Sequence, residues 1–408
     1  MKYIPYSKVL GEMKRLLFIH HVSDIGGASY CLLNIIKNLN RELVTPIVLL
    51  KNDGPLVREL AKHDVEVLFF PSMAVTPYNL SLYNPFCIKN YWELIRALQK
   101  FKVFIKEVKG LDAVYCNNLM LSDYVRIAKQ SGLKTILHIR EHWPLNEHVK
   151  QLEHIISNFK FADQIVAINR YSASLVKNSN VKIIYDWIDL DSRYEPVSFN
   201  EIFGEDVSEK KILVYTGGIQ KIKGPLYVAR GFKECIKGDD YRLLMLGIDN
   251  AKKEYSLIKR IIRSALIRIG YPIYSHNVML AIQKDKRIKT IPSKYLIKDI
   301  IQKAYCNISY FTIPHANLAQ AECVLVGTPT ICAETDESLE YSLEGQLSFL
   351  FKLGDYDGFC NTLRTFEQEY EKKKNRILAD SEIIRGIFDK RKNIDKLNGI
   401  IEGVLFQN

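Results

Sequence analysis

The 408-residue chain lacks several of the patterns that assign a protein to a class at once. No uncharged run approaches the roughly 18 residues that a membrane-spanning helix needs, and the apolar run Leu16 to Ile19 is too short for the core of a secretory signal. We therefore expect a protein that is made and kept in the cytosol. The eight cysteines form no CxxC pair and mostly lie in apolar runs, which indicates buried, reduced thiols.

The usual nucleotide-binding signatures are also missing. The glycine turn at Gly26 and Gly27 follows an apolar segment but matches neither GxGxxG nor a P-loop, so a dehydrogenase or kinase loses its main support. Low-complexity sequence is absent as well. No nucleic-acid recognition motif accompanies the basic residues, which disfavours a nucleic-acid partner.

What the chain does have is a formal charge of +11, an isoelectric point near 9.0, and the composition of a globular protein. The charge suggests a polyanionic partner, which could be an anionic membrane face or a phosphorylated small molecule. The length favours two domains over one.

Short apolar segments alternate with stretches of helical spacing, such as 30–40 and 92–109. This alternation predicts parallel sheets covered by helices on both faces. The predicted strands are 15–21, 44–50, 65–70, 112–117, 134–139, 163–169 and 181–188 in the first half, and 211–217, 241–247, 307–312 and 328–334 in the second.

The fold class is therefore α/β, with two doubly wound, Rossmann-like domains that face a cleft. We expect an N-terminal domain at 1–190, a polar linker at 191–210, a C-terminal domain at 211–380, and a helix at 381–408 that packs back on the first domain. In open α/β sheets, ligands bind beyond the carboxyl ends of the strands, so the functional residues should lie there.

Two glycine turns precede predicted helices and could bind an anion. Gly26 and Gly27 allow close approach to the positive end of a helix, although a plain tight turn explains them about as well. In YTGGIQKIKG, Lys221 and Lys223 follow Gly218 and could meet a diphosphate, whereas a solvated basic loop is the alternative.

Two further positions carry polar chemistry. His138 ends a buried strand and could bond a sugar or accept a proton, or could be a structural histidine bonded to the backbone. The turn IPHANLAQAE places His315 and Asn317 before a helix whose Glu322 could hold a vicinal diol such as ribose. An acidic residue early in a helix is also favoured by the helix dipole alone.

The order of these motifs resembles the retaining GT-B glycosyltransferases of the large group 1 class, also called family 4. The resemblance covers nearly the whole chain, in the segments GGASYCLLNII, LHIRE, ADQIVAINRYS, IIYDWID, GGIQKIKG, LLMLG and PHANLAQAECVLVGTP. It implies an enzyme that moves a sugar from a nucleotide diphosphate donor, such as a UDP- or GDP-sugar, with no metal and no other cofactor. It also implies that the domain at 1–190 lies on the acceptor side and that the domain at 211–380 binds the nucleotide sugar.

The resemblance also implies roles for individual residues. Gly27 would approach the donor diphosphate, Lys223 would neutralise it, Glu322 would hold the ribose and His138 would contact the transferred sugar. Fixed donors belong there because the departing nucleotide gains negative charge.

The chain departs from the family pattern at several positions. Gly218 replaces the arginine of the family's GR...KG turn, Pro314 replaces its first glutamate, eight residues before Glu322, and Asp186 replaces the asparagine of its interdomain signal. Some members have a Pro-His turn at the place of that glutamate. His315 and the turn amides of residues 317 to 319, which are Asn317, Leu318 and Ala319, are then candidates to contact the donor.

Two patterns outside these motifs could bind a metal ion or a membrane. Asp189 and Asp191 have the spacing by which another glycosyltransferase fold holds a metal ion, but they lie at the interdomain signal, which disfavours a metal site. The basic amphipathic stretch 251–271 could rest on an anionic membrane or pack on its own domain with a solvated face.

We expect a glycosyltransferase of bacterial surface-glycan assembly, covering capsule, O-antigen or exopolysaccharide, that acts on a lipid-linked acceptor as a peripheral protein at the inner membrane face. Two alternatives stay open. The chain could be a non-catalytic GT-B-like subunit, as Gly218 and Pro314 suggest, or a nucleotide-sugar epimerase that uses His138, Glu141 and His315.

Overall fold

The computed structural model describes residues 13–76, 85–141, 149–177, 180–188, 196–248, 273–292 and 297–406, with the backbone alone at 85–87 and 149–150. The chain divides into two compact units. The N-terminal unit consists of Met1–Trp187 together with Asp389–Asn408, and the C-terminal unit is Ile188–Phe388.

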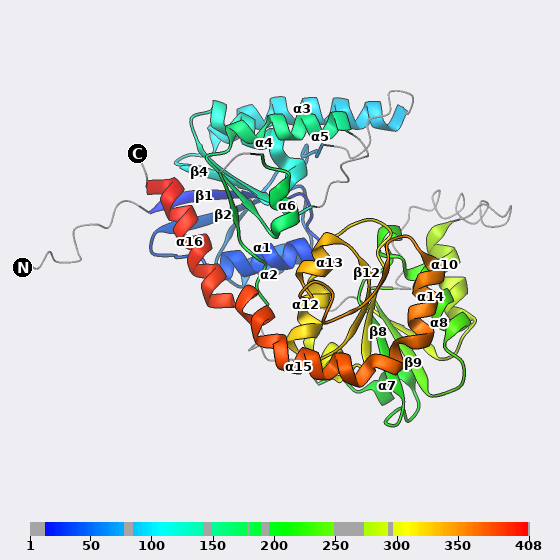
Figure 1. Cartoon of the computed structure of the whole chain (residues 1–408). Helices are drawn as coiled ribbons and strands as arrows, with labels where there is room; N and C mark the ends of the chain where they lie inside the picture. The colour runs from blue at the N-terminus through cyan, green and yellow to red at the C-terminus, as the bar shows by residue number, and fades with distance from the viewer. Residues whose placement is uncertain are drawn as a thin grey trace, which may run out of the picture. The chain divides into compact units, whose positions relative to one another are not determined.

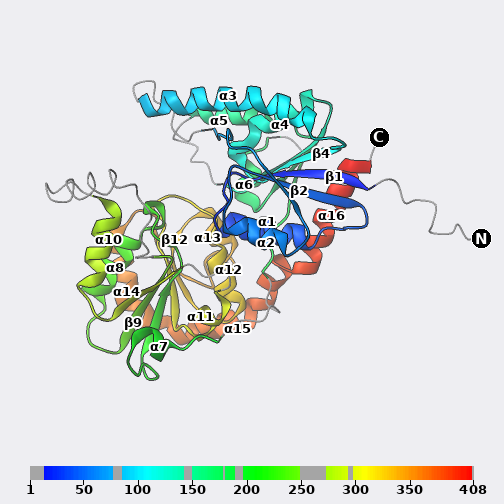
Figure 2. The same ribbon diagram turned by 180° about the vertical axis from the view of Figure 1, so that it is seen from behind.

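The N-terminal unit is built on a seven-stranded parallel sheet in the order β3-β2-β1-β4-β5-β6-β7. Its strands are β1 (Lys14–Ile19), β2 (Val44–Leu50), β3 (Glu66–Phe69), β4 (Ala113–Cys116), β5 (Lys134–Ile139), β6 (Gln164–Ala167) and β7 (Val181–Ile183). Its helices are α1 (Gly27–Lys37), α2 (Pro55–Ala61), α3 (Pro85–Glu107), α4 (Ser122–Gln130), α5 (Val149–Ser157), α6 (Arg170–Ser174) and α16 (Lys390–Phe406). Figure 1 and Figure 2 show α3, α4 and α5 on one face of this sheet and α1, α2 and α16 on the other.

The C-terminal unit is built on a six-stranded parallel sheet in the order β10-β9-β8-β11-β12-β13. Its strands are β8 (Lys211–Tyr215), β9 (Tyr241–Leu246), β10 (Ile288–Ile291), β11 (Cys306–Ser309), β12 (Thr330–Glu334) and β13 (Phe349–Lys352). Its helices are α7 (Phe199–Phe203), α8 (Pro225–Cys235), α10 (Tyr274–Gln283), α11 (Lys298–Lys303), α12 (Leu318–Leu325), α13 (Asp336–Glu340), α14 (Tyr356–Thr365) and α15 (Tyr370–Ile387).

The two sheets share one connectivity. In each, the chain moves outward over three strands, returns past the first, and continues outward in the other direction, which is the doubly wound order of Rossmann-like domains. The strand order reverses between β1 and β4 in one unit and between β8 and β11 in the other. The predicted pair of doubly wound domains is confirmed.

Alternation along β8 shows how the C-terminal unit buries both faces of its sheet. Leu213 and Tyr215 enter the core beneath α8, α10 and α14, whereas Ile212 and Val214 enter the opposite core beneath α7 and α11. Successive side chains of a strand point to opposite faces, so one strand supplies two cores only if nearly all its residues are apolar. This requirement explains the unbroken apolar runs of the sequence.

The C-terminal tail forms two helices that break at Phe388 and Asp389, and the second belongs to the N-terminal unit. On α16, the side chain of Asn398 donates to the carbonyl of Asn38 over 3.0 Å, and Glu402 accepts from the Asn40 side chain over 3.0 Å. Buried Leu397, together with these bonds, fixes the tail against the end of α1.

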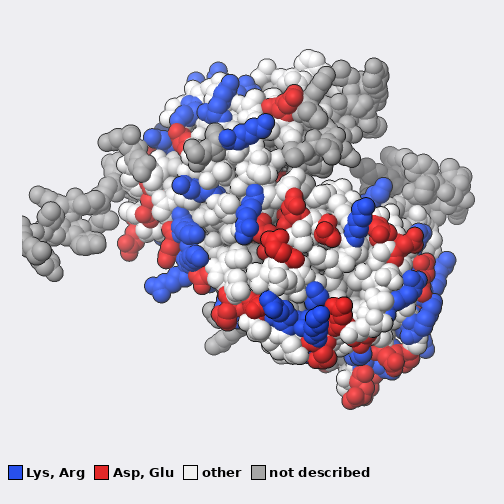
Figure 3. Space-filling view, in the orientation of Figure 1, with Lys and Arg blue, Asp and Glu red and all other residues white. Residues whose placement is uncertain are grey.

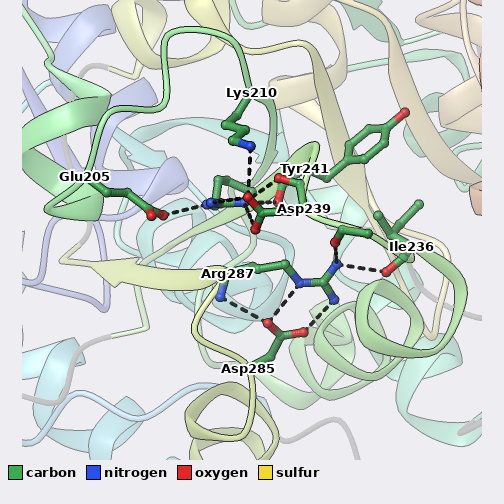
Figure 4. Close-up of polar contacts among 9 residues, drawn as sticks. Glu205, Lys210, Ile236, Asp239, Tyr241, Asp285 and Arg287 are labelled. Atoms are coloured by element: carbon green, nitrogen blue, oxygen red, sulfur yellow. Dashed lines mark hydrogen bonds and ion pairs between the residues drawn. The ribbon is translucent and has the colours of Figure 1, made fainter.

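Charges of both signs are spread over the face shown in Figure 3. At the amino edge of the second sheet they are paired, as Figure 4 shows. The buried guanidinium of Arg242 contacts Glu205 at 2.7 Å and Asp239 at 3.1 Å, and Arg287 contacts Asp285 at 2.7 Å. These cations are therefore neutralised by carboxylates of the chain itself.

Four predictions from the sequence concern the basic stretch, the aspartate pair, the cysteines and membrane-spanning helices. The stretch 251–271 and the pair Asp189 and Asp191 lie outside the described residues. Seven cysteines are described, all of them free, and six of these are buried. Among the helices that the structure describes, none has both the length and the apolar character needed to cross a membrane.

Candidate functional site

The turns that follow β8 and β11 are hydrogen bonded to each other. Because β8 and β11 are neighbours, the segments that leave their carboxyl ends meet at the point where the strand order reverses. The amide of Thr312 donates to the carbonyl of Ile222 over 2.8 Å and joins the two turns. The structure thus brings together the lysine turn and the Pro-His turn.

Glycine shapes the turn after β8. Gly218 and Gly224 have φ values of +73° and +67°, a left-handed conformation that strongly favours glycine. A Cβ on Gly224 would lie 2.4 Å from the ring of Tyr310, so that position is also closed to a side chain. Gly218 replaces the arginine that the family resemblance suggests, and its backbone conformation gives a physical reason for the departure.

Lys223 sits in the short 3-10 helix Lys221–Lys223, and its side chain is partly buried. Its Nζ lies 5.8 Å from the centroid of the Phe311 ring. Burial lowers the pKa of Lys223 below its ordinary value, and no acidic side chain of the described residues offsets this effect. Lys221, by contrast, is exposed. A partly buried cation without a counter-charge among the described residues is a place where an anion binds favourably.

The turn after β11 places a second polar side chain beside the same aromatic ring. His315 meets the ring of Phe311 edge-on, with 5.1 Å between the centroids. Lys223 and His315 therefore both border Phe311, although they are 92 positions apart in the sequence.

Helix α12 begins directly after this turn, with Asn317 as its N-cap. The Asn317 side-chain oxygen accepts from the amide of Gln320 over 3.3 Å, while its buried Nδ2 has no partner among the described residues. Leu318 and Ala319 are the first two residues of the helix, and their amides are among the N–H groups that a helix leaves unpaired. These donors and the helix dipole favour an anion at this end.

Gln320 belongs to the packing and not to a binding surface. It is fully buried, and its Nε2 donates to the Ser338 carbonyl and the Ser348 hydroxyl, each over 3.0 Å. Glu322, one turn further along α12, is a different case. Burial raises the pKa of its carboxyl to about 7, and no neighbouring charge contributes to the shift. A carboxyl poised near neutrality could accept bonds from ribose hydroxyls in its ionised form.

In the N-terminal unit, Gly26 and Gly27 open helix α1. Gly26 is the N-cap with extended backbone, and a Cβ on either glycine would meet no atom within 4 Å. Folding of the turn therefore does not require glycine at these positions. The missing side chains leave open space beside the first amides of α1, where an anion could approach.

His138 lies near the end of β5 inside a buried polar network. Its Nδ1 is 2.5 Å from the Tyr115 hydroxyl and 3.4 Å from a guanidinium nitrogen of Arg140. Both carboxylate oxygens of Asp186 lie 2.7 Å from the other guanidinium nitrogen, and Arg140 Nε donates to Asn117 over 2.8 Å. The network thus spans the carboxyl ends of β4 and β5 and the segment after β7.

These contacts determine which nitrogen of His138 carries the proton. A guanidinium can only donate, and burial raises the pKa of Tyr115 so that its hydroxyl keeps its proton. Burial, followed by the charge of Arg140, lowers the pKa of His138 far enough to keep it neutral. Nδ1 is therefore the acceptor, and Nε2–H is a buried donor with no partner among the described residues.

Sequence reasoning missed three members of this network, which are Tyr115, Asn117 and His20, and it missed the protonation state of Glu141. Asn117 and His20, at the ends of β4 and β1, are fully buried and 3.3 Å apart, and burial lowers the pKa of His20 to about 3. The carboxyl of Glu141 has its pKa raised to about 7 by burial, and it accepts the Leu119 amide over 2.7 Å. Polar residues at the ends of apolar strands were the available signal.

No group of three or more His, Cys, Asp or Glu side chains in the described part of the chain has the arrangement of a metal site. The residues that could contact an anionic ligand are instead lysine, histidine, asparagine and helix amides.

The two sheets define a protein of the GT-B fold, with two Rossmann-like domains in one chain. No family model matches the chain, and a search of curated proteins finds no match. Among solved structures, the chain is similar to Alr3699/HepE from Anabaena in complex with UDP and glucose, with a TM-score of 0.70 and 17% identity over 96% of this chain and 100% of that one.

Two further structures have the same fold. A glycosyltransferase from Rickettsia africae ESF-5 matches with a TM-score of 0.67 and 14% identity, over 98% of this chain and 100% of its own. A putative UDP-N-acetylglucosamine 2-epimerase from Listeria monocytogenes matches with a TM-score of 0.61 and 10% identity, over 98% of both chains. At these identities the likeness establishes the fold.

Proposed function

We propose that this protein is a glycosyltransferase that takes a sugar from a nucleotide diphosphate donor and transfers it to a glycan acceptor. The observation that carries the proposal is the partly buried side chain of Lys223, which has no acidic partner in the described chain, on a turn bonded to the turn before α12. A diphosphate would supply the missing negative charge. The amides of Leu318 and Ala319 would supply further donors.

The proposed reaction places these groups where charge develops. The acceptor hydroxyl oxygen bonds to the anomeric carbon, the bond from that carbon to the diphosphate oxygen breaks, and its electron pair stays on the departing diphosphate. The acceptor's proton passes to that diphosphate or to solvent. Lys223 and the α12 amides stabilise the diphosphate as its charge increases. Glu322 holds the ribose, and Nε2–H of His138 donates to a hydroxyl of the transferred sugar.

The finer assignments are proposals as well. Complexes of HepE with UDP and with UDP-glucose support a uridine nucleotide sugar as the donor. The motif resemblance supports transfer with retention, without a metal ion, in the assembly of a surface glycan. It also supports a lipid-linked acceptor at the inner face of the cytoplasmic membrane.

The epimerase is the second candidate, because a putative epimerase shares the fold. An epimerase would interconvert nucleotide sugars with no acceptor present. Incubation with UDP-sugars alone, followed by chromatographic separation of epimers, distinguishes the two activities. The non-catalytic subunit, suggested by Gly218 and Pro314, would bind no nucleotide sugar at micromolar concentration.

The decisive experiment measures thermal unfolding in the presence of nucleoside diphosphates and their sugars, with EDTA throughout. We expect one nucleotide family to stabilise the protein, by about 2.7 kcal/mol at a hundredfold excess over Kd. The effect should shrink in Lys223→Met and Glu322→Gln and persist in Lys221→Met, which alters an exposed lysine of the same turn. Absence of stabilisation by every nucleotide would overturn the proposal.

A further inference from the structure

Helix α3 carries an unusual outer face in the N-terminal unit. Figure 1 and Figure 2 both show this helix on the outside of the unit, beyond α4 and α5. Its inner side is an ordinary core stripe, with Leu94, Phe101 and Ile105 buried. Its outer side nevertheless exposes large apolar side chains, which the packing of the unit does not explain.

The exposed apolar residues form a row along the helix. Ile88, Trp92 and Val103 are 39%, 58% and 59% exposed. Separations of four and eleven residues place all three on one face at 3.6 residues per turn. Tyr91, 44% exposed, borders the row. Of the eleven exposed large apolar side chains in the described part of the chain, four lie on this helix.

Basic side chains flank the row. Helix α3 exposes five basic and two acidic side chains, a net charge of +3. The basic residues are Lys89, Arg96, Lys100, Lys102 and Lys106, and the acidic residues are Glu93 and Glu107. Only Lys89 is paired within the helix, with Glu93 at 3.7 Å. Figure 3 shows basic side chains over this part of the molecule, at the top of the view. The surface therefore complements an anionic partner that also has an apolar interior.

We propose that the outer face of α3 binds an anionic lipid membrane, with Ile88, Trp92 and Val103 in the interfacial region and the lysines against the headgroups. Amphipathic helices at membrane surfaces combine aromatic and aliphatic residues with basic flanks in this way. Nucleic acid offers phosphate but no matching apolar surface for Ile88 and Val103. The row from Trp92 to Val103 spans about 16 Å, so the helix lies along the membrane plane.

This surface differs from the one that the sequence suggested, residues 251–271. It is also independent of the proposed transferase activity, because lipid binding can be measured without any nucleotide sugar. If the acceptor is lipid-linked, binding through α3 would hold the N-terminal unit at the surface that presents that acceptor.

The test is co-sedimentation of the full-length protein with vesicles of phosphatidylcholine alone or with roughly one third phosphatidylglycerol. We expect binding to the anionic vesicles, weak binding to the neutral ones, and loss of binding as salt is raised. Trp92→Ser should weaken binding at least tenfold, and Lys100→Glu about fivefold or more. The matched control is Leu378→Ser, which removes an apolar side chain that is 61% exposed on α15 in the other unit.

Tryptophan fluorescence is a second measurement of vesicle binding, and it can be used where sedimentation is weak. Tryptophan emission should shift to shorter wavelength with anionic vesicles in the wild type, and the shift should be lost in Trp92→Phe. Equal binding by wild type and Trp92→Ser, equal binding to both kinds of vesicle, or no vesicle binding by the folded protein would each overturn the proposal. Salt-sensitive binding to an acidic protein or an RNA in place of vesicles would overturn it too.

Discussion

The carboxyl edges of the two sheets differ in how their charged groups are paired. In the N-terminal unit, the charges of Arg140 and Asp186 are paired at 2.7 Å, and the Tyr115 hydroxyl is bonded to His138. In the C-terminal unit, Lys223 has no acidic partner among the described residues, and Nδ2 of Asn317 has none of any kind there.

The paired charges of Arg140 and Asp186 support the fold, whereas the unpaired charge of Lys223 is available to a ligand. A network whose charges are paired rigidifies its region, and removal of a member costs stability. A partly buried cation without a counter-charge lowers stability in the absence of a ligand and favours the binding of an anion. Substitutions on the two edges should therefore have opposite consequences for folding and for binding.

The largest expected effect comes from Arg140→Ala. Removal of this guanidinium leaves the largely buried Asp186 carboxylate unpaired, with a side chain only 16% exposed. We expect the free energy of unfolding of the N-terminal unit to fall by about 3–5 kcal/mol. All three tryptophans, Trp92, Trp143 and Trp187, belong to this unit, so their fluorescence during urea unfolding reports it selectively.

The matched control removes an exposed ion pair of the same unit. Lys62 and Glu59 pair at 2.7 Å with the lysine side chain 64% exposed, and Lys62→Ala should cost no more than about 0.5 kcal/mol. Equal losses for Arg140→Ala and Lys62→Ala would show that the network at His138 does not support the fold.

The next effect is on binding, and it tests the opposite edge. Lys223→Met keeps an unbranched side chain and removes the charge, whose pKa burial lowers, so it should leave the unliganded protein at least as stable. We expect UDP affinity, measured by calorimetry, to fall about ten- to a hundredfold, the range for a hydrogen bond to a charged group. Lys221→Met should change it much less. A Lys223→Met protein with lower stability and unchanged UDP affinity would show that Lys223 supports the fold and does not bind the nucleotide.

The fold could be predicted further from the sequence than the site could. Apolar runs predicted eleven of the strands, but β10 and β13 were missed, because Ile288–Ile291 carries a lysine and a threonine and Phe349–Lys352 is only four residues long. In the segment IPHANLAQAE, Gln320 is fully buried and its Nε2 donates to two groups of the core, which its polar character in the sequence does not reveal.

The site was harder to predict because its character depends on partners from distant strands. Nothing near His138 in the sequence shows that Tyr115 bonds its Nδ1, or that Asp186 neutralises Arg140. The left-handed backbone of Gly218 likewise appears only in three dimensions. Motif order identified the positions, and the contacts between strands determine what each side chain can do.

A smaller effect compares two carboxyls, Glu322 and Glu141, whose pKa values burial raises to about 7. In each, the folded state binds more protons than the unfolded state between pH 4.5 and 7, so each lowers stability as pH rises through that window. Glu322→Gln should remove its part of that fall. Glu141→Leu should instead destabilise, because it removes the oxygen that accepts the Leu119 amide at 2.7 Å.

The affinity for UDP is a second test of the Glu322 carboxyl. If the ionised Glu322 holds the ribose, its contribution to UDP affinity should rise about tenfold from pH 6 to pH 8. The ratio of wild-type to Glu322→Gln affinity at each pH cancels the ionisation of UDP itself. A ratio that does not change with pH would exclude a contact between this carboxylate and the nucleotide.

The smallest effect concerns the tautomer of His138. Nδ1 accepts from Tyr115 and lies within reach of Arg140, so nitrogen-15 NMR of histidine-labelled protein should show the proton on Nε2 in the absence of ligand. Tyr115→Phe removes the closer donor and should cost about 1 kcal/mol of unfolding free energy. It should also allow the proton to populate Nδ1. Tyr124→Phe, an equally buried tyrosine whose hydroxyl bonds Ala74, should leave the His138 signals unchanged. A proton found on Nδ1 in the wild type would mean that His138 offers a ligand an acceptor and not a donor, and its proposed bond to the sugar would then run in the opposite direction.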